Sequence, residues 1–273
     1  MVHQLAVVGN VHYLFSHGMA DDASQATRYL EPIKGKKTIR GSCPTIMQEP
    51  YTTFNYDDAP HKMWRANLAQ EGDIKTLEQA YNSILKKDHD AEIVLIGVSR
   101  GAATALGFLG NANPSHIRAV VLESPFDSVS ELITRQLEKL FEQPHTKMKL
   151  ILHERLIPAI LRGYRPDGPT PSNAIPWIPT DLPILVVCSL KDGIVPVGSS
   201  VAVYHQLRQT VHKNVHLLKL DRGEHARIKS DSAEGERYRN VVHAFYKKYN
   251  LAHHNEWAQE GLLAFTQTQP TTS

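Results

Sequence analysis

Short apolar runs that alternate with longer helical patterns constrain the fold of this chain most strongly. Runs rich in β-branched or aliphatic residues occur at 11–15, 51–56, 93–96, 119–122, 184–187 and 215–220. Apolar residues at helical spacing lie between several of them, at 70–85, 102–109 and 199–209, and a last helix is expected near 236–249. Strands that alternate with helices favour a parallel sheet covered on both faces. We therefore predict an α/β fold with a mainly parallel sheet flanked by helices.

The connection between the fourth and fifth runs is about sixty residues long, which is too long for an ordinary loop. It begins with helix signals, because Ser128 and Glu131 have the spacing of a capping box and an apolar face follows them. A second apolar stretch is interrupted by Pro158. We expect residues 128–180 to form a helical cap or lid. Whether its apolar faces cover a substrate or simply pack on the core is open at this point.

The 273 residues are expected to form one α/β domain, since single domains of this class often exceed 200 residues. We assign residues 1–250 to this domain, with the cap inserted in it. Residues 251–273 are expected to form a polar C-terminal tail in which His253 and His254 are exposed.

A Gly-x-Ser-x-Gly pattern, Gly97-Val98-Ser99-Arg100-Gly101, stands where a buried strand must turn directly into a helix. Such a turn is a nucleophile elbow, which projects the serine Oγ from the carboxyl edge of the sheet. The small residues two positions before and after the serine let the strand and the helix approach each other. The pattern alone is weak, and the apolar strand before it and the Ala-rich helix after it make it persuasive.

A serine hydroxyl needs a base to take its proton and an acid to orient that base. Asp192 follows the strand at 184–187, in a turn with Gly193. His225 follows the strand at 215–220, in a loop. Because the carboxyl ends of parallel strands share one edge of a sheet, both side chains are expected to reach Ser99.

At this point the chain resembles the α/β-hydrolase superfamily, over roughly residues 11–249. The resemblance rests on Ser16-His17-Gly18-Met19, the elbow around Ser99, Lys191-Asp192-Gly-Ile-Val-Pro196 and Gly223-Glu-His225, in the order of the family. It implies that Ser99 is the nucleophile, that His225 is the general base and then acid, and that Asp192 fixes the tautomer of His225. The His17-Gly18 pair resembles the oxyanion loop, which implies that the backbone N–H groups of Met19 and Arg100 form the oxyanion hole.

The chain departs from the family at two points. Two strands usually precede the one that leads into the oxyanion loop, yet only sixteen residues precede His17. The first strands are therefore expected to be missing or reduced to residues 5–8. In addition, Asp127 lies where some members carry their acid. We favour Asp192 because its Asp-Gly-Ile-Val-Pro context matches the family better.

Charge and cysteine content exclude several classes of partner. A formal net charge of +2 offers no basic face for nucleic acid. The histidines lack metal-ligand spacing, so no metal is expected, and the proposed chemistry needs no cofactor. The two cysteines, Cys43 and Cys188, do not form a disulfide framework.

The sequence has neither a signal peptide nor a run of about 18 apolar residues, so we expect a cytoplasmic protein without stable membrane insertion.

The expected function is that of a serine hydrolase that cleaves a small-molecule ester or thioester through an acyl-enzyme intermediate. Cleavage of peptides or other amides by the same residues is the alternative reaction. A binding protein that retains the fold without turnover is the alternative from another class. Activity is expected to fall as acid protonates His225, because only the neutral imidazole accepts the serine proton.

Overall fold

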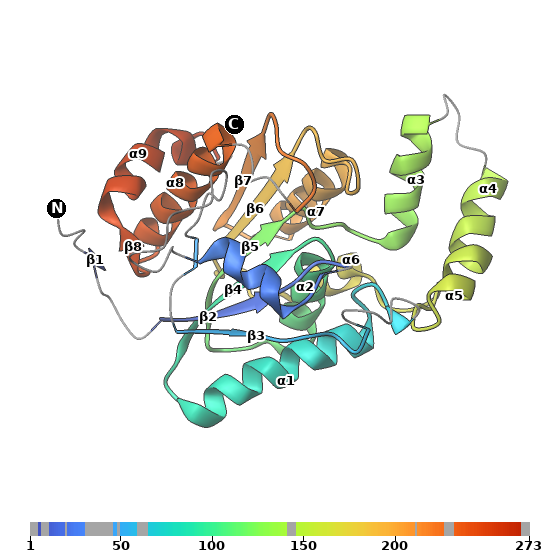
Figure 1. Ribbon diagram of the computed structural model, residues 1–273, viewed down its shortest axis with the longest axis horizontal. Helices are drawn as coiled ribbons and strands as arrows, with labels where there is room; N and C mark the ends of the chain where they lie inside the picture. The colour runs from blue at the N-terminus through green and yellow to red at the C-terminus, as the bar shows by residue number, and fades with distance from the viewer. Residues whose placement is uncertain are drawn as a thin grey trace.

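A computed structural model of the chain describes residues 5–6, 11–19, 21–30, 46–47, 50–58, 65–140, 146–210, 212–226 and 232–268 (Figure 1). The expectations at residues 7–8 and at Cys43 lie outside these ranges. None of the helices in this part of the chain combines the length and the hydropathy that crossing a bilayer requires.

A six-stranded sheet forms the centre of the molecule, in the order β3-β2-β4-β5-β6-β7. All five strand pairs are parallel, which confirms the predicted sheet. The strands are β2 (Val11–Ser16), β3 (Tyr51–Thr53), β4 (Glu92–Val98), β5 (Ile117–Glu123), β6 (Ile184–Ser189) and β7 (Val215–Leu220).

Both faces of the sheet are covered by helices, and each face has its own apolar core. Side chains alternate between the two faces along each strand. In β6, Leu185 and Val187 face the core under η1 (Ala23–Tyr29) and α8 (Ser232–Lys248). Ile184 and Val186 face the opposite core, which also contains the apolar residues of three helices. These are α1 (Glu71–Lys87), α2 (Arg100–Ala112) and α7 (Val197–Gln209).

The long connection between β5 and β6 is helical, as its apolar pattern indicates. It contains α3 (Val129–Leu140), α4 (Thr146–Ile151), η3 (Leu152–Leu156), α5 (Ile157–Ile160), α6 (Pro171–Ala174) and η4 (Ile175–Trp177). Figure 1 shows α3, α4 and α5 standing out from one side of the body, on the right of the view. Pro158 does not break this segment. The π-helical turn η3 directly before it widens the helix where the proline ring would otherwise meet a carbonyl group.

The C-terminal residues correct our expectation of a polar tail. Residues 255–266 form the helix α9 (Asn255–Thr266), which packs against α8 (Figure 1). Its buried face contains Ala258, Gly261 and Phe265, and a Cβ atom on Gly261 would lie 2.0 Å from the backbone oxygen of Asn240. A contact face that includes small residues such as Ala258 and Gly261 gives a weak apolar signal, so the sequence pattern does not predict this helix. Residues 269–273 lie outside the described ranges.

The two adjacent histidines, His253 and His254, lie in a small second sheet. The strand β8 (His253–His254) pairs antiparallel with β1 (Leu5–Ala6), away from the main sheet. Both histidines are 7% exposed, so the expectation that they are solvated is wrong. Within the described ranges, β2 is the first strand of the six-stranded sheet, and residues 5–6 add no strand to it.

Candidate active site

The carboxyl edge of the sheet brings Ser99, Asp192 and His225 together. Ser99 follows β4 at φ 54° and ψ −116°, a strained backbone that turns the chain directly into α2. The glycines around it permit the turn. A Cβ atom on Gly101 would lie 2.0 Å from the backbone oxygen of Ser16, and one on Gly97 would lie 2.7 Å from the Ala102 Cα.

Two hydrogen bonds link the three side chains. The Ser99 Oγ lies 2.8 Å from the His225 Nε2, and the His225 Nδ1 lies 2.8 Å from the Asp192 Oδ2. The Asp192 side chain is only 1% exposed, whereas that of His225 is 16% exposed. The loops after β4, β6 and β7 therefore place the three residues in the geometry that a nucleophile, its base and an orienting acid require.

The charge of Asp192 determines which nitrogen of His225 carries a proton. Burial alone raises the pKa of Asp192, but hydrogen bonds from His225, Ser124 and Val195 hold it below its ordinary value. An ionised carboxylate only accepts hydrogen bonds, so the His225 Nδ1 donates to it. The Nε2 of the neutral ring is then the acceptor that faces the Ser99 hydroxyl.

The loop after β2 lies beside the nucleophile. A Cβ atom on Gly18 would lie 3.7 Å from the Cβ of Ser99. The Gly18 N–H donates to the Oε1 of the buried Gln25 at 2.8 Å, so this amide is already engaged. The next amide is that of Met19. The Arg100 amide lies in the first turn of α2, where no intrahelical acceptor is available to it.

The side chain of Arg100 lies in a buried ion-pair cluster beneath the elbow. Its guanidinium donates to both oxygens of Asp58 at 2.7 Å and to both oxygens of Asp73 at 2.6 and 2.5 Å. The Arg100 side chain is 2% exposed and stacks on the ring of Tyr56. Burial alone lowers the pKa of Arg100, but the two carboxylates raise it above its ordinary value, so the guanidinium remains charged.

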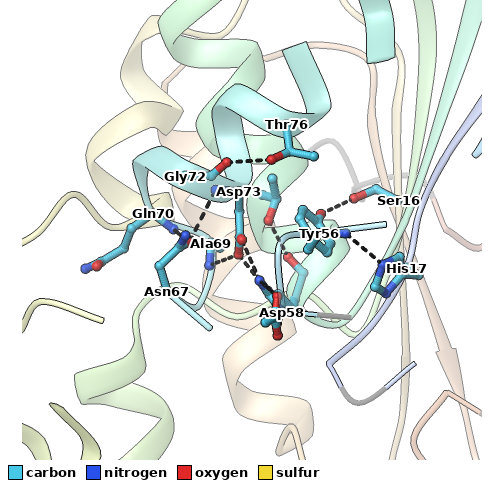
Figure 2. Close-up of polar contacts among 12 residues, drawn as sticks. Ser16, His17, Tyr56, Asp58, Asn67, Ala69, Gln70, Gly72, Asp73 and Thr76 are labelled. Atoms are coloured by element: carbon cyan, nitrogen blue, oxygen red, sulfur yellow. Dashed lines mark hydrogen bonds and ion pairs between the residues drawn. The ribbon is translucent and has the colours of Figure 1, made fainter. Parts of the chain in front are cut away.

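The same cluster connects the elbow to three other segments. Figure 2 shows Asp58, Asp73 and Tyr56 gathered at this point. The Tyr56 hydroxyl lies 2.5 Å from the Ser16 Oγ at the end of β2. Asp73, in the first turn of α1, also accepts from the Ala69 N–H at 2.8 Å. Arg100 therefore ties the start of α2 to β2, to the loop after β3 and to α1.

Asp127 has a different set of contacts. Its carboxylate accepts two hydrogen bonds from Arg135 of α3, at 2.7 and 3.0 Å. Its backbone oxygen accepts from the amide and hydroxyl of Ser172, each at 3.1 Å. Asp127 thus connects both ends of the cap to the body.

Several residues at the site were not identified from the sequence. Asp58 and Asp73 are separated from Arg100 by 42 and 27 positions, so no local spacing marks them as its partners. Gln25 and Ser124 are single polar residues without a motif. Only the helix-start position of Asp73, in the first turn of α1, is a signal in the sequence.

An apolar cluster, which we call the cap cluster, joins the site to the cap. It includes Phe126 after β5, Val195 beside Asp192, and Leu161 and Tyr164 of the cap. Partly buried side chains pack against it, among them Met19 of the loop after β2 and Leu132, Ile133 and Ile157 of the cap. Polar catalytic candidates and an apolar wall thus lie side by side. No group of three or more His, Cys, Asp or Glu side chains in the described ranges is arranged to hold a metal ion.

Comparisons with known proteins identify the fold. A comparison with models of known protein families found no match, and neither did a comparison with curated proteins. Among solved structures, the chain is similar to the Pyrococcus furiosus esterase Pf2001, with a TM-score of 0.56 and 18% identity over 88% of this chain and 83% of the esterase. MenH from S. aureus is similar with a TM-score of 0.54 and 15% identity, over 92% of this chain and 100% of that protein.

An acylaminoacyl peptidase from Pyrococcus horikoshii has a TM-score of 0.56 at 14% identity, over 92% of this chain but only 39% of the peptidase. The parallel sheet order and the turn at Ser99 agree with the resemblance seen in the sequence. The chain has the α/β-hydrolase fold.

Proposed function

We propose that the chain is a serine hydrolase that cleaves a carboxylic ester or thioester of a small molecule. The observation that carries this proposal is the pair of 2.8 Å hydrogen bonds from Ser99 through His225 to Asp192. An esterase is among the solved structures of similar fold, which is consistent with the proposal. No metal or cofactor takes part in the proposed reaction.

In the proposed reaction, the Ser99 Oγ attacks the carbonyl carbon while its proton passes to the His225 Nε2. Asp192 holds the ring and stabilises the imidazolium that forms. The amides of Met19 and Arg100 donate to the oxyanion. His225 then protonates the leaving group, which departs and leaves the acyl group on Ser99. Water, deprotonated by the same nitrogen, releases the acid and restores the enzyme.

The cap cluster supports an acyl group as the part of the substrate that is recognised. Met19, Leu132 and Ile133 are only partly buried, and they pack against the cap cluster, which contains Phe126 and Val195. Apolar side chains in this position offer burial to an acyl chain at about 25 cal/mol for each Å² removed from water. The near-neutral net charge of +2 is consistent with a substrate that is bound by shape and apolar contact.

Hydrolysis assays with matched variants test the proposal. We expect the wild type to hydrolyse p-nitrophenyl esters of graded chain length or the corresponding acyl-thioesters, and Ser99→Ala to be inactive. Ser83→Ala is the control, because the Ser83 hydroxyl bonds only to the backbone oxygen of Ala80, on the exposed side of α1. Cleavage of dipeptide amides without ester or thioester cleavage would contradict the proposal in favour of an amidase. Binding of an acyl ligand with no turnover would contradict it in favour of a binding protein.

A further inference from the structure

The carboxylate of Asp192 accepts four hydrogen bonds. Its Oδ1 accepts from the backbone N–H groups of Ile194 and Val195, at 2.9 and 2.8 Å. Its Oδ2 accepts from the His225 Nδ1 and from the Ser124 Oγ, both at 2.8 Å. Each carboxylate oxygen offers about two lone pairs, so all four acceptor positions are occupied. The position and the charge of this carboxylate are therefore set by its four donors.

Two of the four donors, Ile194 and Val195, belong to the same loop as Asp192, and a third is His225 itself. The fourth donor, Ser124, comes from the end of another strand of the sheet. It directly follows β5 and is fully buried, 68 positions away from Asp192 along the chain. Its N–H continues the β5–β6 ladder by donating to the Val187 oxygen at 2.8 Å.

The backbone of Ser124 is strained. Its φ of 50° lies in the left-handed region, which is unfavourable for a non-glycine residue. Two other residues at this edge of the sheet share a positive φ, namely Ser99 at 54° and Ala226, next to His225, at 55°. Strain of this kind persists where the surrounding structure requires it, and at Ser124 the strained turn directs the hydroxyl onto Asp192.

We propose that Ser124 is a positioning residue, which holds Asp192 so that His225 is aimed at Ser99. This inference rests on the proposed hydrolase function. Without the hydroxyl, Oδ2 keeps only the His225 hydrogen bond, and three donors in place of four hold the carboxylate, so its orientation is less tightly fixed. The Ser99–His225 pair then samples productive geometry less often, which lowers kcat more than it changes KM.

The charged and titratable groups near Asp192 come from several elements. From the loop after β7 it faces His225. From α3, the Lys139 ammonium donates to the Asp192 backbone oxygen at 3.3 Å. In β6, the Cys188 thiol contacts the Leu218 backbone oxygen, and burial raises its pKa to about 12, so this thiol is neutral. Glu123, which precedes Ser124, accepts instead from the Tyr29 hydroxyl at 3.0 Å.

The effect of Ser124 on pH dependence therefore acts through the Asp192–His225 pair. A hydroxyl donor neutralises part of the negative charge on Oδ2. Removing it leaves more of that charge facing the His225 Nδ1, which favours the imidazolium. We expect the pH midpoint of the acid limb of kcat/KM to move upward when the hydroxyl is lost.

Two substitutions at Ser124 and one matched control test the inference. Ser124→Ala removes the hydroxyl and keeps the backbone strain, and Ser124→Gly removes both. Ser200→Ala is the control, because Ser200 is equally buried and its hydroxyl bonds only to the Pro125 backbone oxygen, at 2.8 Å. The readouts are kcat and KM on the ester or thioester that the wild type hydrolyses best, the pH profile of kcat/KM, and the thermal midpoint.

We expect both Ser124 variants to lose roughly tenfold to hundredfold in kcat, less than the loss of about 10⁴-fold that follows loss of the acid itself in a serine protease. The acid limb moves to higher pH, and Ser200→Ala matches the wild type in both. In Ser124→Gly the relieved strain offsets part of the stability lost with the hydrogen bond, so we expect its thermal midpoint to lie at or above that of Ser124→Ala. Activity lost equally in both variants is then not a folding defect.

Wild-type kcat and an unchanged acid limb in Ser124→Gly would overturn the inference, whatever happens to Ser124→Ala. A wild type without hydrolysis that depends on Ser99 would instead overturn the proposed function, and this inference with it. The two failures are distinguished by the Ser99→Ala comparison made on the same substrate.

Discussion

The backbone amide and the side chain of Arg100 act separately. We propose that its backbone amide helps to hold the oxyanion, while its side chain pairs with Asp58 and Asp73 beneath the elbow. Two carboxylates face one guanidinium in this cluster, and all three side chains are at most 4% exposed. Buried charges are tolerated only when they are paired and hydrogen-bonded. The side chain of Arg100 is therefore a condition for the geometry at Ser99.

Removing the guanidinium is expected to destabilise the whole chain. Arg100→Met leaves Asp58 and Asp73 buried without their partner, which costs about 3–5 kcal/mol of unfolding free energy. Urea denaturation measures this loss. The control is Arg118→Met, because Arg118 is 54% exposed and pairs with Glu92 at 3.5 Å on the surface. There we expect less than about 1 kcal/mol. Equal effects of the two substitutions would contradict the structural role of Arg100.

The two aspartates after β5 and β6 are expected to differ sharply in their effect on activity. Asp192→Asn removes the charge that orients His225, so kcat should fall by about 10⁴-fold, as in the serine-protease template. Asp127→Asn loosens the Arg135 contact of the cap and leaves the Ser99–His225 hydrogen bond in place. Its kcat should stay within about tenfold of the wild type, with any change appearing mainly in KM. If only Asp127→Asn lost activity, the assignment of the acid would be wrong.

At the scale of elements, short segments hold the loops of the site. The helix η1 places Gln25 so that its Oε1 accepts from the Gly18 N–H, which fixes the orientation of the His17–Gly18 peptide, one residue before the Met19 amide. Asp22 caps this helix by accepting from the Ser24 N–H at 2.8 Å. The proposed oxyanion loop thus depends on a helix that itself contributes no catalytic group.

Substitution of Gln25 tests this dependence. In Gln25→Met the side chain keeps a similar volume but offers no strong acceptor, so the Gly18 amide loses its partner and the loop moves. We expect kcat to fall by roughly tenfold or more, since loss of one oxyanion donor costs about 10²–10³-fold. The control, Thr27→Ala, removes an exposed hydroxyl of the same helix that bonds to the Ser24 oxygen, and it should not change kcat. A Gln25→Met enzyme with wild-type kcat would contradict this role of η1.

The main elements and the site candidates are predictable from local pattern, and long-range partners are not. Continuous apolar runs mark β4 and β6, because a central parallel strand is buried on both faces. The Gly-x-Ser-x-Gly pattern predicts the turn at Ser99 for a steric reason. A Cβ atom at Gly97 or Gly101 would clash with the neighbouring backbone, so only glycine fits at these two positions. The strain at Ser124 depends on tertiary contacts across the sheet, so no spacing in the sequence predicts it.

At the scale of the whole molecule, the body extends beyond the residues that we assigned to the domain. The helix α9 packs on α8, and Phe265 joins the same core as β6 and β7 at 2% exposure. The cap stands at the other side of the molecule (Figure 1) and is tied to the body through Asp127 and through Gln70, whose Nε2 donates to the Arg165 oxygen at 2.6 Å. The C-terminal helix therefore contributes stability, and the cap lies where it can influence the substrate.

The contribution of α9 is measurable with two substitutions in that helix. Phe265→Ala removes a buried ring and should lower the unfolding free energy by about 3–5 kcal/mol. Leu263→Ala, at a side chain that is 75% exposed, should change it by less than about 0.5 kcal/mol. Urea denaturation of both variants provides the comparison. Equal stability of the two would show that α9 is the tail that its composition indicates.

Covalent labelling shows whether Ser99 is a nucleophile that His225 activates. The protein is incubated with a fluorophosphonate, and the modified peptide is identified by mass spectrometry. We predict a single adduct on Ser99 in the wild type, much slower labelling in His225→Ala, and no labelling in Ser99→Ala. Equal labelling of the wild type and Ser99→Ala, or an unlabelled Ser99 in folded wild-type protein, would contradict this role of Ser99.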